Sequence, residues 1–391
     1  MHENFLKYLK KWLSISNVAV VVMSFVLGWI IASYQVNDVR KSDLFLQTWT
    51  ILSERFIDRE AIVPEKMLLG ATRGVLTSIG DPSTMLLTRE EKEVLQEFLS
   101  RRFEGIGVQL ARNNNNDLVV YSIFKGSPAE KSEIKKGDKV ISINGENTAG
   151  MSPLAAQSLL KARKGSQLSI GIYDRESSQA RIVSLLSHEF KVTSVESQQI
   201  LTVRGKRFTY IKVSGFTEET IMEWNKIFST INLDDLDGLV LDIRDNHGGI
   251  KEVPIFIASE FIESGDLYLV EDRKGIKPIT LTSHEAKLRD TPLVVLINRS
   301  TVSSAELLAA IFQYSKKGIL VGERTFGKNT IQDFFDLSSE VSMVMTTSRW
   351  YMPNNETIAG KGLSPDIYIN PKNDESGDAQ LNEALNILDK F

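Results

Sequence analysis

The sequence predicts an α/β chain with more than one domain, and three successive changes in its hydrophobic pattern support this. Residues 38–100 carry apolar side chains close to helical spacing, and residues 101–190 carry short strand-like runs between turn signals. Residues 191–370 alternate apolar runs of strand length with amphipathic segments, which is typical of crossover units and a mostly parallel sheet. A length of 391 residues suits about two or three domains.

The composition excludes several classes of function. Lysine and arginine number 46 against 50 aspartates and glutamates, so the net charge of −4 gives no basic field that favours nucleic acid as a partner. The chain has no cysteine, which excludes disulfides, a thiolate nucleophile and cysteine-ligated metals. His188 and His284 have no partners at metal-ligand spacing, so we expect neither a metal nor another cofactor.

The N-terminal segment predicts a membrane anchor. Lys7, Lys10 and Lys11 precede an uncharged stretch, residues 12–37, whose apolar centre with its flanks reaches the roughly 20 residues that a membrane span needs. Basic residues before a span indicate a cytoplasmic N-terminus. We therefore expect residues 1–37 to hold a cytoplasmic stub and an anchor, with the rest exported to a bacterial periplasm or to the outer face of the plasma membrane. A cleaved signal peptide and a buried soluble helix are the alternatives.

The next segment is expected to be helical. Apolar side chains repeat at helical spacing over 42–56 and 68–79, and residues 80–83 (Gly-Asp-Pro-Ser) form a turn signal. Thr88 is placed to cap a third helix, with Glu91 completing a capping box. Because so small a helical unit buries little by itself, we expect it to pack on the core or on a second subunit of a homo-oligomer.

Residues 101–190 predict a compact β module with one helix. Ser152 is a suitable N-cap and Pro153 a suitable first helical residue. The strands are expected at 107–110, 118–123, 139–143, 168–173 and 180–185.

Residues 191–370 predict the alternating α/β core. Its strands are expected at 209–213, 238–243, 293–297 and 319–321, and its helices at 218–230, 252–262 and 304–314. A β-hairpin or meander follows over 334–351, and the last segment, residues 371–391, ends in a helix over 380–388.

A serine and a lysine form the most informative pattern in the core. The apolar run 293–297 ends in a hydroxyl-rich cluster, and a helical pattern begins directly after Ser303, which places this serine at a strand-to-helix corner. A serine hydroxyl needs a base, and burial can lower the pKa of Lys328 far enough for it to act as one. Gln332 is neutral and suited to hold the uncharged amine. Because Ser303 also stands at capping-box spacing from Glu306, only the joint pattern indicates catalysis.

A polar turn with two glycines supports this interpretation. The apolar run 238–243 ends in a turn that contains Gly248 and Gly249, where the backbone can approach a ligand closely. Their N–H groups, with that of Ser304, would form an oxyanion hole. His247 in the same turn leaves an alternative open, a Ser–His–Asp triad with Asp242 or Asp245 as its acid.

These residues together resemble a carboxyl-terminal processing protease, also called a tail-specific protease. The resemblance covers nearly all of the chain after the anchor. Six segments carry it in order: 80–83, 103–108, 126–130 with 135–145, 241–249 (Leu-Asp-Ile-Arg-Asp-Asn-His-Gly-Gly), 298–306 (Asn-Arg-Ser-Thr-Val-Ser-Ser-Ala-Glu), and 322–328 (Gly-Glu-Arg-Thr-Phe-Gly-Lys) with Gln332.

The resemblance implies an α/β protease core of the crotonase or Clp-protease type, with an inserted PDZ domain. It implies Ser303 as nucleophile, Lys328 as base, Gln332 as support, and Gly248 or Gly249 with Ser304 as oxyanion donors. It also implies that no histidine is catalytic. The sequence departs from the family pattern at Ser300, where glycine is commoner, at His247, where proline or glycine is frequent, and at Val302, which stands directly before the nucleophile.

The β module 101–190 is similar to a PDZ domain. Such a domain adds a peptide as an extra strand at an open sheet edge and captures its terminal carboxylate with backbone N–H groups. The residues expected at this site are Gly105, Ile106, Gly107, Val108, Leu159 and Leu160. A packed β domain that only positions subunits is the alternative.

The resulting hypothesis is an exported, membrane-anchored serine endopeptidase that binds the apolar C-terminal tail of a protein and cleaves near it. The first alternative is a catalytically silent PDZ scaffold or adaptor on a protease fold. The second is another hydrolase on a crotonase-like fold. An adaptor protein is a further partner that the sequence leaves open.

Overall fold

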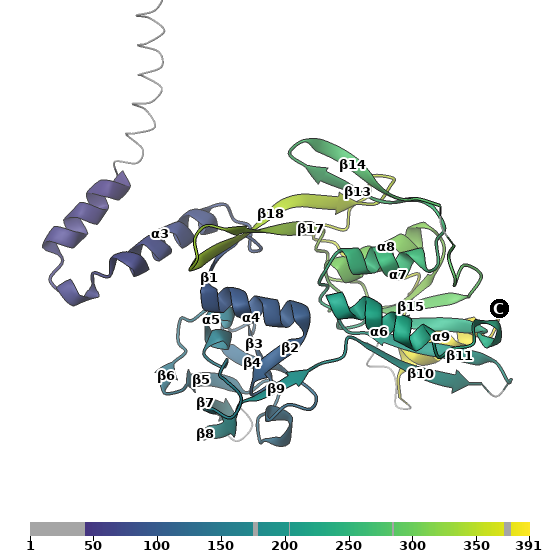
Figure 1. Ribbon diagram of the computed structural model, residues 1–391, viewed down its shortest axis with the longest axis horizontal. Helices are drawn as coiled ribbons and strands as arrows, with labels where there is room; N and C mark the ends of the chain where they lie inside the picture. Colours follow the sequence, from purple (N-terminus) through teal and green to yellow (C-terminus); the bar gives the residue numbers. More distant parts are fainter. Residues whose placement is uncertain (1–43, 175–178, 203, 284, 371–376) are drawn as a thin grey trace, which may run out of the picture. The chain divides into compact units, whose positions relative to one another are not determined.

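The computed structural model describes most of the chain after the predicted anchor (Figure 1). The described residues are 44–174, 179–202, 204–283, 285–370 and 377–391. The anchor expected within residues 1–37 lies outside them. Among the residues that are described, no helix has both the length and the apolar character to cross a membrane. The chain divides into two units, one ending at Val75 and the other beginning at Leu76.

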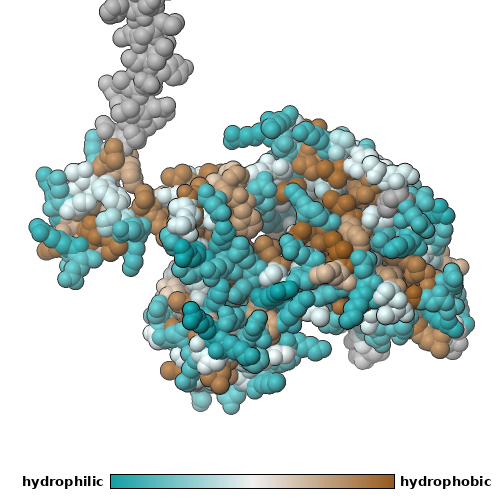
Figure 2. Space-filling view, viewed as in Figure 1, coloured by the Kyte–Doolittle hydropathy of each residue, from teal (hydrophilic) through white to brown (hydrophobic). Residues whose placement is uncertain are grey.

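The described part of the first unit is helical. A helix covers residues 44–55, a short 3-10 turn η1 covers Arg59–Ala61, and α3 runs over Pro64–Ser78. The helix expected at 68–79 thus begins earlier, at Pro64, because proline suits the first helical position. Figure 2 shows hydrophobic side chains at the surface of this unit among hydrophilic ones. Leu44 and Ile57, 73% and 91% exposed, belong to this surface. The described part of this unit, residues 44–75, therefore buries little core of its own.

The second unit begins with a turn, a short strand and a capped helix. Strand β1 covers Met85–Thr88 and helix α4 covers Arg89–Ser100. The Glu91 N–H donates to Thr88 Oγ1 (3.2 Å), and the Thr88 N–H donates to Glu91 Oε2 (2.9 Å). This reciprocal pair is the predicted capping box.

Residues 102–191 form the β module. A sheet in the order β3-β4-β5-β7-β8 surrounds an aliphatic core, with β6 paired to β5. Ser152 caps α5 with Pro153 as its first residue, as predicted. Two strands that the sequence did not reveal, β2 and β9, pair with each other. The bounds are β2 Arg102–Gly105, β3 Val108–Arg112, β4 Leu118–Ile123, η2 Ala129–Lys131, β5 Lys139–Ile143, β6 Glu146–Asn147, α5 Pro153–Ser158, β7 Gln167–Asp174, β8 Gln179–Leu186 and β9 His188–Lys191.

The described residues of the core form a six-stranded sheet in the order β10-β11-β12-β15-β16-β19. Strand β10 is antiparallel to β11, and the other neighbours are parallel, as predicted. The bounds are β10 Val195–Leu201, β11 Arg207–Val213, α6 Glu218–Phe228, η3 Leu233–Asp235, β12 Gly238–Asp242, α7 Glu252–Ser259, β15 Leu293–Ile297, α8 Ser304–Tyr314, β16 Ile319–Gly322, β19 Ile367–Tyr368 and α9 Ala379–Leu388.

Both faces of this sheet are covered. Leu239 and Leu241 pack with α6, α7 and α8, whereas Val240 between them packs with α9. Alternating side chains are therefore all buried, which is why these strands read as continuous apolar runs in the sequence. The arrangement leaves the carboxyl ends of the parallel strands at one edge of the sheet, where ligands bind in such folds.

A second sheet pairs strands that lie far apart in the sequence. Its described strands run in the order β1-β18-β13-β14, with β17 also paired to β18. The hairpin expected at 334–351 is present as β17 and β18, while the β13–β14 hairpin was not foreseen. The bounds are β13 Gly265–Asp272, β14 Gly275–Leu281, β17 Thr330–Asp336 and β18 Val341–Tyr351.

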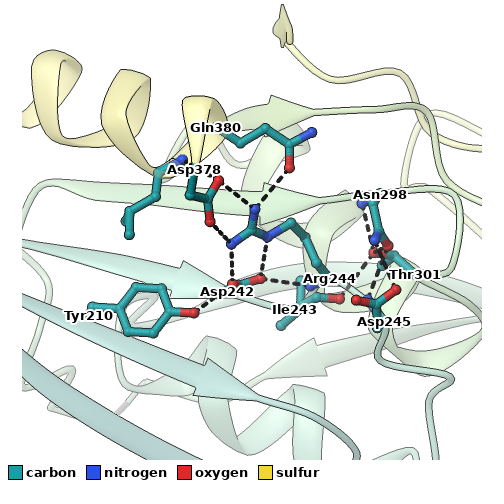
Figure 3. A network of polar contacts seen from close by, with 10 residues as sticks. Tyr210, Asp242, Ile243, Arg244, Asp245, Asn298, Thr301, Asp378 and Gln380 are labelled. Atoms are coloured by element: carbon teal, nitrogen blue, oxygen red, sulfur yellow. Dashed lines mark hydrogen bonds and ion pairs between the residues drawn. The ribbon is translucent and has the colours of Figure 1, made fainter. Parts of the chain in front are cut away.

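A partly buried arginine, Arg244, joins the end of β12 to the start of α9 (Figure 3). Arg244 Nη2 lies 2.6 Å from Asp242 Oδ2 and 2.7 Å from Asp378 Oδ2, and Arg244 Nη1 donates to Gln380 Oε1 (3.1 Å). The Tyr210 hydroxyl also donates to Asp242 Oδ2 (2.7 Å). Because the Asp242 side chain is fully buried, these donors are needed to stabilise its negative charge.

We expect Arg244→Ala to lower the free energy of unfolding of the core by about 3–5 kcal/mol, since it leaves a buried carboxylate without its cation. Chemical denaturation followed by tryptophan fluorescence measures this. Arg289→Ala is the matched control, because Arg289 forms its ion pairs with Glu263 and Asp290 at the surface. Equal denaturation midpoints for the two variants would contradict the assignment.

Candidate active site

Ser303 occupies a strained corner between β15 and α8. Its backbone has φ 60° and ψ −123°, a conformation that costs a residue with a side chain about 1–3 kcal/mol. Two hydrogen bonds hold the corner against the end of β12: Thr301 Oγ1 donates to Ile243 O (3.0 Å), and the Val302 N–H donates to Asn246 O (2.9 Å). The corner therefore presents Ser303 at the carboxyl edge of the parallel strands.

The carboxylate of Glu306 joins this corner to the segment that carries Lys328. Glu306 is fully buried. It accepts hydrogen bonds from the backbone N–H groups of Ser303 (2.9 Å), Gly327 (2.6 Å) and Lys328 (2.9 Å), and from the Thr325 hydroxyl (2.5 Å). Burial raises the pKa of Glu306, although these donors act in the opposite direction. One side chain thus fixes the backbone of both predicted catalytic residues.

The Lys328 amine is half-buried beside this carboxylate. Burial lowers the pKa of Lys328, while the negative charges of Asp81 and Glu306 act in the opposite direction. Throughout the described segments, the Ser303 hydroxyl and the Lys328 amine share no hydrogen bond. Catalytic hydrogen bonds are often long without substrate and tighten in the substrate complex. The structure therefore brings the two residues to one site without joining their side chains.

Gln332 lies on β17 in the same sheet as β18. Its Nε2 donates to Thr330 Oγ1 (2.8 Å) and to Thr346 Oγ1 (3.2 Å). The amide nitrogen of Gln332 is thus held by two threonines, and its contact with the Lys328 amine stays a prediction.

The turn with two glycines packs directly on the nucleophile corner. Gly248 has φ +91°, and a Cβ placed there would lie 3.1 Å from Ser303 Cβ and 2.9 Å from Ser304 Oγ. Ser304 Oγ donates to Gly249 O (3.2 Å), and the Gly248 N–H donates to Asn246 Oδ1 (2.8 Å). In the described chain the N–H groups of Gly249 and Ser304 donate no hydrogen bond. Of the predicted oxyanion donors, Gly249 and Ser304 therefore have N–H groups available to a substrate.

His247 does not assemble a triad with Ser303 in this structure. Its Nε2 lies 3.3 Å from the Tyr121 hydroxyl, a contact from strand β4 of the β module. Asp242 is bound by Arg244 and Tyr210, and Asp245 accepts from the Asn298 amide (3.0 Å). Burial lowers the pKa of His247. The geometry thus favours the serine and lysine over the Ser–His–Asp alternative.

The β module closes its own sheet edge. Strand β3 is an edge strand, and the side chain of Gln157 from α5 pairs with it: Nε2 donates to Val108 O (2.9 Å), and the Leu110 N–H donates to Oε1 (3.0 Å). Leu160 is buried in the core of the module, and Leu159 packs against that core. A cavity of about 20 Å³, lined by residues that include 103–108, Gln157 and Leu160, lies beside β3 and has room for about one water.

The role of Glu306 was hidden in the sequence. Its spacing from Ser303 predicted only a capping box, because its other donors come from a loop more than twenty residues away. The hydrogen bonds to that loop require the fold.

We expect Glu306→Gln to lower kcat/KM for peptide cleavage by about a hundred-fold, because an amide NH₂ placed against backbone N–H donors displaces Ser303 and Lys328 relative to each other. Glu340→Gln, at an exposed position (62% exposed) on the turn between β17 and β18, is the control. Thermal melting shows whether each variant is folded. Wild-type cleavage by folded Glu306→Gln would contradict the prediction.

Comparison with known proteins finds two family models that match parts of the chain. Residues 207–369 match the model of Peptidase family S41, and residues 96–173 match that of the PDZ domain. The chain is 29% identical over 338 residues to a chloroplastic C-terminal processing peptidase of Tetradesmus obliquus, which covers 83% of this chain and 73% of that protein.

Two further proteins are similar to this chain. Carboxy-terminal processing protease CtpA of Bacillus subtilis is 31% identical over 304 residues, 78% of this chain and 64% of that protein. The structure of a photosystem II D1 C-terminal processing protease superposes with a TM-score of 0.63 at 26% identity, covering 88% of this chain and 96% of that one. The mixed α/β multidomain fold is thus confirmed. The chain contains one segment that matches the PDZ domain and one that matches Peptidase family S41, and it is similar to carboxyl-terminal processing proteases.

Proposed function

We propose that the protein is an exported serine endopeptidase that recognises apolar C-terminal tails through its PDZ domain and cleaves them with a Ser303–Lys328 dyad. The observation that carries the proposal is the Glu306 carboxylate, which fixes the backbone of Ser303 and of Lys328 from one buried position. Export rests on the predicted anchor within residues 1–37.

The geometry supports the following reaction. Ser303 Oγ attacks the carbonyl carbon of the scissile amide while neutral Lys328 Nζ accepts the hydroxyl proton. The N–H groups of Gly249 and Ser304 stabilise the negative oxygen of the tetrahedral intermediate. Lys328 then donates its proton to the departing amine, which leaves an acyl-serine. Water attacks this ester while Lys328 accepts a proton from it, and Lys328 then donates this proton to Ser303 Oγ as the ester bond breaks and the new carboxyl terminus is released.

Tail recognition is assigned to the edge of β3 that the Gln157 side chain covers. An incoming chain would pair there with the backbone of Val108 and Leu110, in place of the Gln157 amide. The backbone N–H groups of residues 105–108 would take the terminal carboxylate. Phe103, Phe124 and Phe190 beside this segment supply an apolar wall for the last side chain.

A catalytically silent PDZ scaffold is the second candidate. The absence of a hydrogen bond between the described side chains of Ser303 and Lys328, together with the presence of a PDZ domain, favours this candidate over other hydrolases. A cleavage assay distinguishes the two functions, because a protease shortens a protein that carries the tail, whereas a scaffold binds it and leaves its length unchanged.

We expect Ser303→Ala and Lys328→Ala each to lower cleavage of an unfolded protein with an apolar tail by at least about a thousand-fold. Ser304→Ala keeps its backbone N–H and loses at most about ten-fold. Mass spectrometry of the products measures both. Wild-type cleavage by Ser303→Ala or Lys328→Ala would refute the dyad, and intact substrate with the wild-type enzyme would favour the scaffold.

We also expect an amidated C-terminus to slow cleavage by about ten-fold or more, because the loss of the terminal carboxylate removes charge-assisted hydrogen bonds. The pair of substrates has the same sequence and differs only at its last group. The comparison of kcat/KM at substrate concentrations below KM measures the effect. Equal values for the two substrates would argue against carboxylate capture.

A further inference from the structure

The turn before β1 fixes a carboxylate. Asp81 accepts the Ser83 N–H at Oδ1 (3.0 Å) and the Thr84 hydroxyl at Oδ2 (2.6 Å). Burial raises the pKa of Asp81, but the hydrogen bonds from Thr84, Thr346 and the Ser83 N–H outweigh it, so this pKa lies below its ordinary value. Asp81 is therefore a held, ionised carboxylate at neutral pH.

A chain of hydrogen bonds connects this turn to Gln332. Strand β1 pairs with β18, and the Thr346 N–H of β18 donates to Thr84 Oγ1 (3.2 Å). Thr346 is also the register partner of Gln332 on β17, and its Oγ1 accepts the Gln332 amide (3.2 Å). Asp81, more than two hundred positions upstream of Gln332, thus shares a hydrogen-bond network with this predicted support of the lysine base.

The negative charges of Asp81 and Glu306 both act to raise the pKa of Lys328, against the larger effect of burial. Glu306 comes from α8, and its oxygens are occupied by N–H and hydroxyl donors from the Ser303 and Lys328 segments. Asp81 lies far upstream of Lys328 in the sequence, in the turn before β1, and the pairing of β1 with β18 connects this turn to the second sheet. The influence is mutual, because the Lys328 cation also lowers the pKa of Asp81.

We propose that Asp81 is a positioning residue of the active site, which holds the lysine end of the dyad through its charge and holds Gln332 through Thr84 and Thr346. The inference rests on the proposed Ser303–Lys328 mechanism. It assigns a function to the turn formed by residues 80–83. The negative charge sets the pH at which Lys328 becomes a base.

The sign of this effect is fixed by electrostatics. A nearby anion stabilises the ammonium and raises the pKa of Lys328, so its removal lowers that pKa. The neutral amine is the active form, and kcat/KM of the wild type therefore rises with pH through the pKa of Lys328. In Asp81→Asn this rise moves to lower pH by about one unit. The plateau falls about ten-fold or more, because Gln332 loses its anchored partner.

The test is the pH profile of kcat/KM for the full-length protein with a peptide that ends in apolar residues. Asp333→Asn is the matched control, since Asp333 is the neighbour of Gln332 on β17 and its carboxylate accepts from Thr347 instead (2.5 Å). The expected result is a shifted rise in Asp81→Asn and an unshifted one in Asp333→Asn. A rise at the wild-type pH in folded Asp81→Asn overturns the proposal, as does an equal shift in the control.

If Asp81→Asn does not fold, Thr84→Val replaces it, because this change removes the hydroxyl that joins Asp81 to Thr346 and preserves the size of the side chain. A plateau about ten-fold lower supports the inference, and a wild-type plateau overturns it. Failure of the dyad is recognised separately, by cleavage with Lys328→Ala. If Lys328→Ala is inactive and Asp81→Asn keeps the wild-type profile, only the role of Asp81 is lost.

Discussion

The buried carboxylate of Glu306 is the interaction on which the rest of the site depends. A charge removed from water is costly unless donors surround it, and here the donors are backbone N–H groups from two segments and one hydroxyl. The same hydrogen bonds that satisfy Glu306 fix the strained backbone of Ser303 and the position of Lys328. A single set of hydrogen bonds therefore satisfies the buried carboxylate of Glu306 and positions Ser303 and Lys328.

The two acidic residues near Lys328 have different consequences. Glu306 accepts hydrogen bonds from backbone N–H groups on both sides of the site, so its main effect is to hold the chain. Among the described residues, the hydrogen bonds to Asp81 come from its own turn and from Thr346, and its charge also acts on the Lys328 amine. Burial of Lys328 opposes both charges and makes deprotonation easier. The pKa of Lys328 lies below its ordinary value, because the effect of burial exceeds that of the two charges.

The sequence predicted those parts of the fold whose signal is local. Strand β15 and helix α8 were placed at their observed bounds because both are apolar and buried, with a polar corner between them. Strand β10 was missed because most of its side chains are exposed and polar, and the β13–β14 hairpin because its second strand is largely exposed. At the site, the sequence pattern predicted Ser303 and Lys328 as a pair. It did not predict the hydrogen bonds of Glu306 and Asp81, because their partners come together only when distant segments of the chain pair in the fold.

The closed edge of the PDZ module bears on where tail specificity arises. An unpaired edge strand invites non-specific pairing with other chains, and the Gln157 amide satisfies one N–H and one C=O of β3 in advance. An incoming backbone that replaces this amide exchanges two hydrogen bonds for similar ones and gains little from them. In the proposed function, discrimination then depends on what Gln157 does not supply, the terminal carboxylate and an apolar last side chain. A polar internal segment offers neither, so the proposed site would not select it.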